Sequence, residues 1–558
     1  MGERSVEEFS LLIGGKAGFG IDKAGMVIAG ILSRLNYRIY IYRDYPSLIR
    51  GGHTFSIIRA NKKKSAAHFN KVDFILALNQ ETFDLHRNRL NTGGIVIFDI
   101  DSVKVENLPI SAGVPIGKIM KEEAASEIMR NSCIIGAFAK AAGIDWDILK
   151  EIFDAEMDRE AQANLKIARR GYDETQQLLR VEPVSGQPLP FITGNEALSQ
   201  GLIKAGLNVY VAYPMTPSSG ILHYMASTAD KSGVTALHLE SEISVIMAAL
   251  GFAYAGKKAA VGTSGGGFCL MTEGLSFSGM SELPVVIVMG QRTGPSTGLP
   301  TYTGQSELDF VISAGHGEFP RLVVAPGDCE EAYFWAGAAL NLAWQFQIPA
   351  IILTDKTLAE GVASFDLEAA GEVKEKYFSL WDKKGAYKRY ALSENGVSPL
   401  AFAPEKDAVI KVSSYEHDEA GITIENAEST RVMQEKRLGK EKYLLSALES
   451  YEAVKVYGDK NSAQALLCWG SNKDVCREAA ERLKLKVIQP LVLWPFPLKQ
   501  FKAALSGVTR LIVVENNATG QLKNLIKRFG IVADEQILKY DGRPFTIDEL
   551  IEEARKRI

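Results

Sequence analysis

Apolar runs alternate with amphipathic segments along most of this chain. In residues 9–46 an apolar run, a glycine turn, an amphipathic stretch and a second apolar run follow one another, which predicts a strand, a helix and a strand. Further strand-like runs lie at 53–61, 72–79 and 93–101, and helical periodicity extends from about 121 to 169. We therefore predict an α/β domain over residues 1–183. The Pro-, Gly- and Ser-rich stretch 180–191 is the linker candidate.

Residues 190–355 repeat the alternation more regularly. Their strand-like runs are almost continuously apolar and are separated by helical stretches, which predicts a parallel sheet covered by helices on both faces. The pattern weakens over 356–460, where we expect an irregular connecting excursion. It returns over 461–558, which predicts a third α/β unit. The predicted fold class is α/β with three such units.

Composition excludes several classes of protein. Hydrophobic residues make up 46% of the 558 residues and charged residues 23%, with a formal net charge of −4, so no large positive field attracts a nucleic acid. No apolar run reaches the roughly 20 residues needed to cross a bilayer, and the acidic start lacks the plan of a secretion signal. We expect a cytoplasmic protein without a membrane or nucleic-acid partner. The scattered cysteines form no C-x-x-C pair, and we expect no metal ligated by this chain.

Four polar segments each follow a predicted strand of the middle unit. They are YPMTPSS at 213–219, LESEISV at 239–245, TSGGGF at 263–268 and QRTGPSTGLPT at 291–301. Because ligands of parallel sheets bind beyond the carboxyl ends of the strands, we expect the four segments to converge on one rim. No iron ligand set, metal-diphosphate motif or complete dinucleotide fingerprint accompanies them, so the rim reads as half of a composite active site.

Two of these segments carry candidates at helix starts. Thr216 is predicted as an N-cap with Pro217 in the first helical position, which makes either a plain helix start or a site for an anion. Glu242 opens a helix whose following face is apolar. It is either an ordinary first-turn acid or a desolvated carboxylate able to share a proton with a heterocyclic nitrogen.

The other two segments are a glycine turn and a stiff loop. Residues 263–268 contain three consecutive glycines, which either make an ordinary turn or allow close approach of a flat ligand. Arg292 ends an apolar strand and precedes a loop rich in Gly and Pro. Its guanidinium either pairs with a structural carboxylate or grips the carboxylate of a ligand.

The glycines near the amino end are an incomplete nucleotide fingerprint. Gly15, Ala17 and Gly20 stand where three glycines are required, which disfavours a nicotinamide or flavin site. A phosphate-bearing group at the start of the following helix remains reasonable.

Taken together, the segments resemble the alpha subunit of the 2-oxoacid:ferredoxin oxidoreductases in the form with a gamma domain fused in front. The combination is specific, and the resemblance covers essentially the whole chain. It is carried by GGKAGFG (14–20), YPSLIRGGHTFSIIR (45–59), YPMTPSS, TSGGGFCLMTEG (263–274), QRTGPSTGLPT, EHDEAG (416–421), LWPFP (493–497) and VVENNATGQL (513–522). It implies a gamma-type domain at 1–183, a thiamine-pyrimidine domain at 190–355 and a transketolase-C-like domain at 461–558.

The resemblance also implies chemistry and partners. This chain would form a heterodimer with a beta subunit that holds the diphosphate and Mg²⁺ of thiamine diphosphate and a [4Fe–4S] cluster. The pair would convert a 2-oxo acid, such as 2-oxoglutarate or a pyruvate-like acid, to acyl-CoA and CO₂, with electrons passing to ferredoxin.

Residue roles carried over by motif are as follows. The resemblance implies catalytic roles for Glu242, Thr216 and Arg292, and substrate binding by Tyr213, Pro214, Thr216, Arg292 and Thr301. It implies cofactor binding by Glu242, Thr263, Ser264 and Gly265, and contacts to coenzyme A from Gly15, Gly18, Gly20 and Arg50. Family members usually have Ile at Met215 and Pro at Gly266, and these departures leave the substrate preference open. Two rival hypotheses are a non-catalytic scaffold subunit and a dehydrogenase that binds NAD or FAD in the amino-terminal domain.

Overall fold

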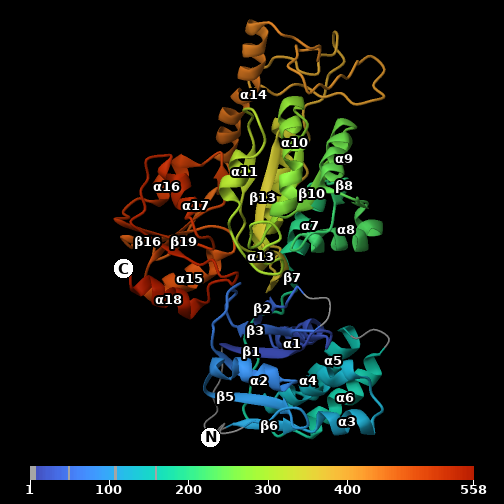
Figure 1. Ribbon diagram of the computed structural model, residues 1–558, viewed down its shortest axis with the longest axis vertical. Coiled ribbons are helices and arrows are strands. Elements are labelled where there is room, and N and C mark those ends of the chain that lie inside the picture. The colour runs from blue at the N-terminus through green and yellow to red at the C-terminus, as the bar shows by residue number, and fades with distance from the viewer. Residues whose placement is uncertain (1–7, 48–50, 106–109, 157–159) are drawn as a thin grey trace. The chain divides into compact units, whose positions relative to one another are not determined.

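A computed structural model describes residues 8–47, 51–105, 110–156 and 160–558. The chain forms two compact units. The first comprises Met1–Ile192, Gly361–Asp366 and Thr546–Glu549, and the second comprises Thr193–Glu360, Leu367–Phe545 and Leu550–Ile558. Each unit is built around parallel-containing sheets, which confirms the predicted α/β class (Figure 1).

The first unit contains an eight-stranded sheet with the order β6-β5-β4-β1-β3-β2-β14-β7. The strands are β1 (Glu8–Lys16), β2 (Arg38–Asp44), β3 (His53–Asn61), β4 (Val72–Ala77), β5 (Leu90–Asp99), β6 (Ser111–Val114), β7 (Phe191–Thr193) and β14 (Val362–Ser364). The helices are α1 (Ile21–Arg34), α2 (Gln80–His86), α3 (Ile116–Glu122), α4 (Arg130–Ala141), α5 (Trp146–Glu156) and α6 (Ala161–Asp173). Alternate residues of β1, Phe9, Leu11 and Ile13, point into the core that α1 and α4 share.

The strand order of this sheet differs from that of a dinucleotide-binding fold. β3 lies between β1 and β2 and is antiparallel to both, whereas a dinucleotide-binding unit places its first two strands side by side. Asp44, the acid at the end of β2, accepts a hydrogen bond from the Tyr42 hydroxyl at 2.9 Å. The topology therefore adds to the sequence argument against an NAD or FAD site.

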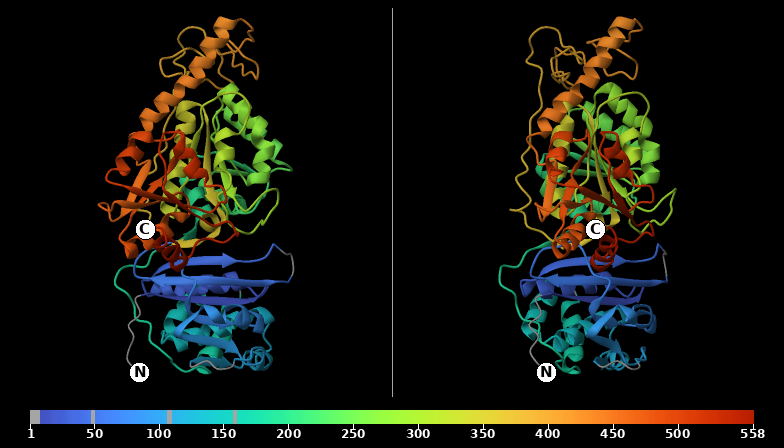
Figure 2. Two further views of the ribbon diagram at one scale, coloured as in Figure 1. Left: turned by 60° about the vertical axis from the view of Figure 1, so that its left-hand side comes forward. Right: turned by 90° about the vertical axis from the view of Figure 1, so that its left-hand side faces the viewer.

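The second unit contains a seven-stranded sheet with the order β18-β12-β13-β11-β10-β8-β9, in which only β18 is antiparallel to its neighbour. The strands are β8 (Val209–Ala212), β9 (Thr235–His238), β10 (Ala259–Thr263), β11 (Val285–Gln291), β12 (Leu322–Val324), β13 (Pro349–Asp355) and β18 (Val492–Trp494). The helices are α7 (Gly194–Lys204), α8 (Ser219–Ser232), α9 (Glu242–Tyr254), α10 (Gly265–Ser281), α11 (Leu308–Ser313), α12 (Cys329–Phe346) and α13 (Lys356–Glu360). α9 packs on α10, while α7 packs on α8 and α12. Figure 2 shows the chain from two further sides, coloured by residue number.

A five-stranded sheet with the order β15-β17-β16-β19-β20 completes this unit. It consists of β15 (Val454–Gly458), β16 (Gln464–Cys468), β17 (Lys486–Pro490), β19 (Arg510–Glu515) and β20 (Glu535–Leu538), with α15 (Asn472–Leu483), α16 (Leu498–Ala504), α17 (Gln521–Lys527) and α18 (Ile547–Arg555). The apolar run 486–497 divides between two sheets, because β17 pairs here and β18 pairs with β12. The two later sheets of the chain are thus joined through one continuous segment.

The region 356–460 contains a 22-residue helix, α14 (Ala427–Leu448), which the sequence pattern does not resolve (Figure 1). Its buried face mixes the charged residues Lys436, Arg437 and Lys440 with the apolar residues Met433, Leu444 and Leu448. Lys436 and Lys440 both pair with the buried carboxylate of Glu282, at the end of α10. Because charged residues occupy half of these packed positions, the hydrophobic periodicity that usually reveals a helix is weakened.

We expect Glu282→Gln to lower the free energy of unfolding of the second unit by about 3 kcal/mol, because it leaves two buried ammonium groups without their counter-charge. Urea unfolding followed by circular dichroism measures this. Glu435→Gln is the matched control, since Glu435 pairs with Arg431 on the exposed face of α14, the helix that carries the two lysines, and the substitution is expected to change stability by less than about 0.5 kcal/mol. Equal effects of the two substitutions would contradict the anchoring role of Glu282.

Across the described ranges, no helix is both long and apolar enough to span a membrane. The same residues contain no group of three or more His, Cys, Asp or Glu side chains placed to hold a metal ion.

Candidate active site

The four polar segments all leave the seven-stranded sheet at the carboxyl ends of its strands. They follow β8, β9, β10 and β11, and these strands are parallel. The register pairs Ala212 with both His238 and Gly262, so the ends of β8, β9 and β10 are level. The segments therefore meet at the carboxyl rim of the sheet, as the strand pattern predicts.

Glu242 is the first residue of α9 and is only 4% exposed. Its Oε1 is buried and has no hydrogen-bond partner in the described part of the chain. A Cβ added at Gly267, in the first turn of α10, would lie 2.6 Å from this oxygen. The carboxylate is thus pressed against the start of α10, where a glycine is required. A buried carboxylate oxygen without a partner is costly, which indicates that a ligand completes its hydrogen bonding.

The start of α10 offers further unsatisfied groups. Ser264 is the N-cap, yet its side chain makes no capping hydrogen bond, and its buried Oγ has no partner among the residues described. Thr263 Oγ1 faces Gly267, and the helix begins with the glycines predicted to admit a flat ligand. A Cβ at Gly266 would meet nothing within 4 Å, so this position faces open space.

Arg292 and Thr216 lie together. Arg292 is half-buried, and its Nη1 donates a hydrogen bond to the backbone carbonyl of Thr216 at 3.1 Å. Burial lowers the pKa of Arg292, but a guanidinium remains charged at any physiological pH. The loop after Arg292 folds back on itself through an antiparallel bridge between Thr293 and Leu299. This arrangement fixes a cation at the rim.

The predicted capping role of Thr216 is wrong. α8 begins at Ser219, and its N-cap is Ser218. The backbone N–H and the Oγ of Ser218 both bond to the carbonyl of Met215, so the chain completes a turn before the helix starts. Pro217 therefore lies in this turn, and Thr216 contributes its backbone oxygen to the hydrogen bond from Arg292.

The remaining predicted residues are more dispersed. Tyr213 is exposed, with its ring edge-on to His238 at a centroid distance of 6.3 Å, and Pro214 is half-buried. Thr301 is buried in the loop that follows Arg292. Gly15, Gly18 and Gly20 belong to the first unit, at the turn from β1 to α1, and Arg50 lies outside the described residues.

Glu307 is a rim residue that the sequence reasoning missed. Its Oε1 accepts a hydrogen bond from Ser306 Oγ at 2.9 Å, while its Oε2 is buried without a partner in the described chain. A Cβ at Gly265 would lie 3.2 Å from Glu307 Oε1, so the carboxyl group lies beside the first residue of α10. Burial raises the pKa of Glu307 to about 7, against the opposing effects of Ser306 and Arg292. The only signal in the sequence is an acid in a short polar run before an apolar helix.

Gln305 was also missed, and it connects the loop to distant parts of the chain. Its Nε2 donates to the carbonyl of Trp469 at 2.9 Å, and its Oε1 accepts from Asn472 Nδ2 at 2.8 Å and from the backbone N–H of Asn516 at 3.0 Å. Trp469 and Asn516 each follow a strand of the five-stranded sheet. That sheet therefore holds the loop that carries Arg292 and Glu307.

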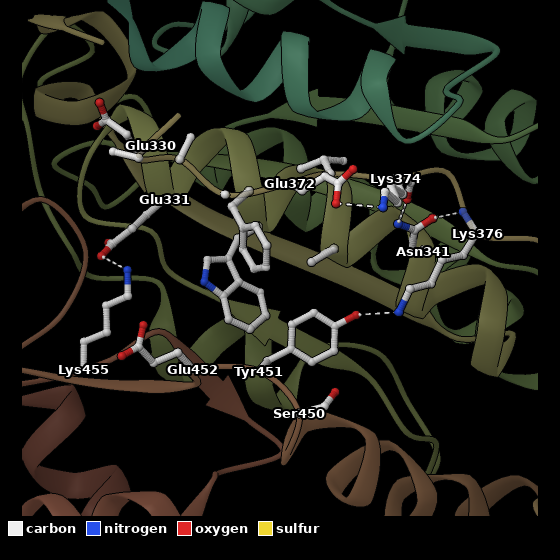
Figure 3. A pocket seen from close by; sticks show the side chains of 17 residues that line it. Glu330, Glu331, Asn341, Glu372, Lys374, Lys376, Ser450, Tyr451, Glu452 and Lys455 are labelled. Carbon is white, nitrogen blue, oxygen red and sulfur yellow. Dashed lines mark hydrogen bonds and ion pairs between the residues drawn. The ribbon is translucent and has the colours of Figure 1, made fainter. Parts of the chain in front are cut away.

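A cavity of about 510 Å³ lies elsewhere in the second unit, between α12, residues 369–376 and residues 450–455 (Figure 3). Rings of Phe334, Trp335 and Tyr451 line it, together with charged side chains that already pair with one another, such as Lys455 with Glu331. None of the predicted site residues lines this cavity.

Comparison with known proteins identifies the family. The family described as "Pyruvate flavodoxin/ferredoxin oxidoreductase, thiamine diP-bdg" matches residues 200–437, and "Pyruvate ferredoxin/flavodoxin oxidoreductase" matches residues 10–174. A 2-oxoacid:ferredoxin oxidoreductase alpha subunit from Sulfolobus is 31% identical over 98% of this chain and 97% of its own length. The chain belongs to the 2-oxoacid:ferredoxin oxidoreductase alpha subunits.

Two further relatives support this family assignment. A 2-oxoglutarate synthase subunit from Archaeoglobus fulgidus is 39% identical over 33% of this chain and 54% of its own length. The solved 2-oxoglutarate:ferredoxin oxidoreductase from Magnetococcus marinus, with 2-oxoglutarate, coenzyme A and succinyl-CoA bound, has a TM-score of 0.90 at 29% identity, over 99% of this chain and 100% of that one. The predicted family and enzyme class are confirmed, and the alpha-subunit assignment implies further subunits in a complex.

Proposed function

We propose that this chain is the alpha subunit, fused to a gamma-type domain, of a CoA-acylating 2-oxoacid:ferredoxin oxidoreductase. The complex oxidatively decarboxylates a 2-oxo acid, either 2-oxoglutarate or a pyruvate-like acid, to acyl-CoA and CO₂ and passes the electrons to ferredoxin. The observation that carries the proposal is the buried Oε1 of Glu242, which has no partner among the described residues and lies at the same rim as the Arg292–Thr216 pair.

The residues at the start of α10 fit the ring of thiamine diphosphate. Thiamine diphosphate, when bound, supplies the carbon nucleophile and the electron sink of the reaction. Glu242 offers a buried carboxylate oxygen to a nitrogen of the aminopyrimidine, and the low-polarity surroundings strengthen that hydrogen bond. Thr263, Ser264 and Gly265 form the adjoining wall, where Ser264 Oγ is available to the ligand.

Arg292 is assigned to the carboxylate of the 2-oxo acid. Its guanidinium is fixed by Thr216 and retains further N–H donors for a carboxylate. Tyr213, Pro214, Thr216 and Thr301 complete the substrate pocket in this proposal. A fixed cation in a water-poor site binds an anionic substrate without reorganisation at the moment of reaction.

A second chain completes the site in this proposal. We assign to a beta subunit the diphosphate of the cofactor, Mg²⁺ and the [4Fe–4S] cluster. Exposed apolar side chains support a docking surface on the helices that carry the site: Ile243 (55% exposed) and Met247 (45%) on α9, and Leu270 (50%) on α10. Apolar groups gathered on the surface of a soluble protein usually mark an interaction site. Coenzyme A is assigned to the gamma-type domain, at the turn of Gly15, Gly18 and Gly20.

Met247→Asp is expected to abolish co-purification of the partner chain, because it places a charge in the apolar docking surface on α9. Pull-down followed by size-exclusion chromatography measures this. Val532→Asp is the control, since Val532 is 75% exposed and lies beyond α17, outside the docking surface. Undiminished recovery of the partner with Met247→Asp would place the interface elsewhere.

The proposed activity is tested on the native complex. With thiamine diphosphate and coenzyme A present, we expect reduction of ferredoxin or a viologen that depends on both the 2-oxo acid and coenzyme A. A panel of 2-oxoglutarate, pyruvate and branched-chain 2-oxo acids then assigns the substrate. A complex that reduces no acceptor with any of these acids contradicts the proposal, while acid-dependent reduction of NAD without a second chain supports the dehydrogenase hypothesis.

A further inference from the structure

Three buried oxygen atoms without partners in the described chain surround the first turn of α10. They are Glu242 Oε1, Ser264 Oγ and Glu307 Oε2. A Cβ added at Gly267 would lie 2.6 Å from Glu242 Oε1, and one added at Gly265 would lie 3.2 Å from Oε1 of the Glu307 carboxyl group. Ser264 is the N-cap of the same helix. The proposed function assigns the first two oxygens to the cofactor. It leaves the third, on Glu307, without a role.

The backbone of Glu307 is firmly held at the rim. Its N–H donates to the side-chain oxygen of Gln291, the last residue of β11, at 3.2 Å. Its carbonyl accepts from the N–H of Val311 in α11. The side chain of Gln305, two residues earlier, makes three hydrogen bonds to residues that follow β16 and β19 of the five-stranded sheet. The fold therefore holds the backbone that carries this carboxyl group, and the hydroxyl of Ser306 holds its Oε1.

Near Glu307, binding of an anionic substrate would leave more negative than positive charge. Arg292, in the loop after β11, is the cation that interacts with Glu307. Asp309 is the acid two residues further along, in α11, and Glu242 on α9 lies against the same first turn of α10, which contributes no charged residue. α17 presents the neutral Gln521, which accepts from the N–H of Asp309, while Arg528 beyond α17 interacts with Asp309. A carboxylate that pairs with Arg292 would add a second negative charge beside an ionised Glu307. Two like charges in one site repel each other, which favours binding of a proton by one of the two carboxylates.

We propose that Glu307 binds a proton together with the substrate: when the carboxylate of the 2-oxo acid pairs with Arg292, Glu307 becomes protonated and donates a hydrogen bond from Oε2 to the bound acid. The proton comes from solvent, and no covalent bond of the substrate changes in this step. This inference rests on the proposed role of Arg292. It gives the buried Oε2 the partner that it lacks, and it makes Glu307 a substrate-binding residue.

The pKa of Glu307 supports this role. Burial raises it to about 7, so the free site exchanges a proton near neutral pH, and the bound carboxylate raises it further. A raised pKa means that affinity is full below the pKa of the free site and falls as pH rises through it. For a single linked proton, the Michaelis constant for the 2-oxo acid is expected to rise about tenfold between pH 6 and pH 8. The maximal rate is not linked to this proton.

The test uses the purified complex with its partner chain. The Michaelis constant and kcat are measured from pH 6 to pH 9 for the wild type, Glu307→Gln and Asp309→Asn. The wild type and Asp309→Asn are expected to show the tenfold rise, and Glu307→Gln is expected to show a constant Michaelis constant. Ser306→Ala removes the hydrogen bond that lowers the pKa of Glu307, so the rise is expected to move to higher pH. Ser306 is exposed, and this variant is expected to fold normally.

Calorimetry supplies a readout without turnover. Titration of 2-oxoglutarate or pyruvate into the thiamine-free complex, in phosphate and in Tris at pH 7.5, reports protons taken up on binding through the difference in buffer heat. The wild type is expected to take up most of one proton and Glu307→Gln none. Equal pH profiles for the wild type and Glu307→Gln, or binding of the acid to the wild type without proton uptake, overturns the role of Glu307. A wild-type complex that neither binds nor turns over any 2-oxo acid overturns the proposed function instead.

Discussion

Replacing Glu242 by Gln is expected to lower the 2-oxoacid-dependent activity of the complex about 10³-fold, within the range that loss of a positioned acid–base group produces. The amide has nearly the shape of the carboxyl group but cannot carry its charge or exchange its proton. Because Glu242 is 4% exposed and its Oε1 has no partner in the described chain, water does not substitute for it easily. Steady-state reduction of a viologen by the reconstituted complex measures the loss.

Glu240→Gln is the matched control for this substitution. Glu240 lies two residues earlier in the same segment and is exposed, so the same chemical change is expected to alter the rate less than about twofold. Circular dichroism and co-purification of the partner chain show whether Glu242→Gln folds and assembles. A folded, assembled Glu242→Gln complex with the wild-type rate would support the scaffold hypothesis over a catalytic subunit.

The rim was predictable from sequence because it depends on local patterns. Continuous apolar strands separated by helices require a parallel sheet, and the carboxyl ends of its strands lie on one edge. The sequence pattern predicts Glu242 at the start of a helix and Arg292 at the end of a strand. In the structure Glu242 is the first residue of α9, and Arg292 directly follows β11. The burial of Glu242 follows from the apolar helix that it begins, so a single sequence contains that information.

The errors arise where long-range contacts override local signals. The segment TPSS (216–219) contains three residues that commonly serve as N-caps. Ser218 is the N-cap in the structure, because its hydrogen bonds to Met215 complete a turn before the helix begins. α14 buries lysines because Glu282, far away in sequence, neutralises them. Gln305 and Glu307 acquire their environment from β16, β19 and α10, and no periodicity in their own segment could indicate it.

These long-range contacts have a functional consequence within the second unit. The loop of residues 292–307 carries Arg292 at its start and Glu307 at its end, and Gln305 holds it to the segments after β16 and β19. The five-stranded sheet thereby positions groups that belong to the seven-stranded sheet's rim. The carboxyl-terminal α/β region supplies none of the predicted site residues, but in this chain it holds the loop that carries Arg292 and Glu307.

Replacing Arg292 by Ala is expected to lower kcat/KM for the 2-oxo acid about 10²- to 10³-fold, mainly through a higher Michaelis constant, as loss of one partner of a desolvated charge pair does. Thiamine diphosphate is expected to bind normally, because the cofactor is assigned to Glu242 and the start of α10. Separate titrations of the cofactor and the 2-oxo acid measure the two affinities. Arg292→Lys retains the charge but not the planar fork, so about a tenfold loss is expected.

Arg528→Ala provides the control for charge alone. Arg528 is exposed just beyond α17, near the rim but outside it, and its removal changes the net charge of the chain by the same amount. We expect its effect on kcat/KM to be less than about twofold and to disappear in salt, because exposed charges are screened. If Arg292→Ala saturated normally with the 2-oxo acid and lost only kcat, the guanidinium would act on the reaction itself, and carboxylate binding would have to be assigned to another donor at the rim.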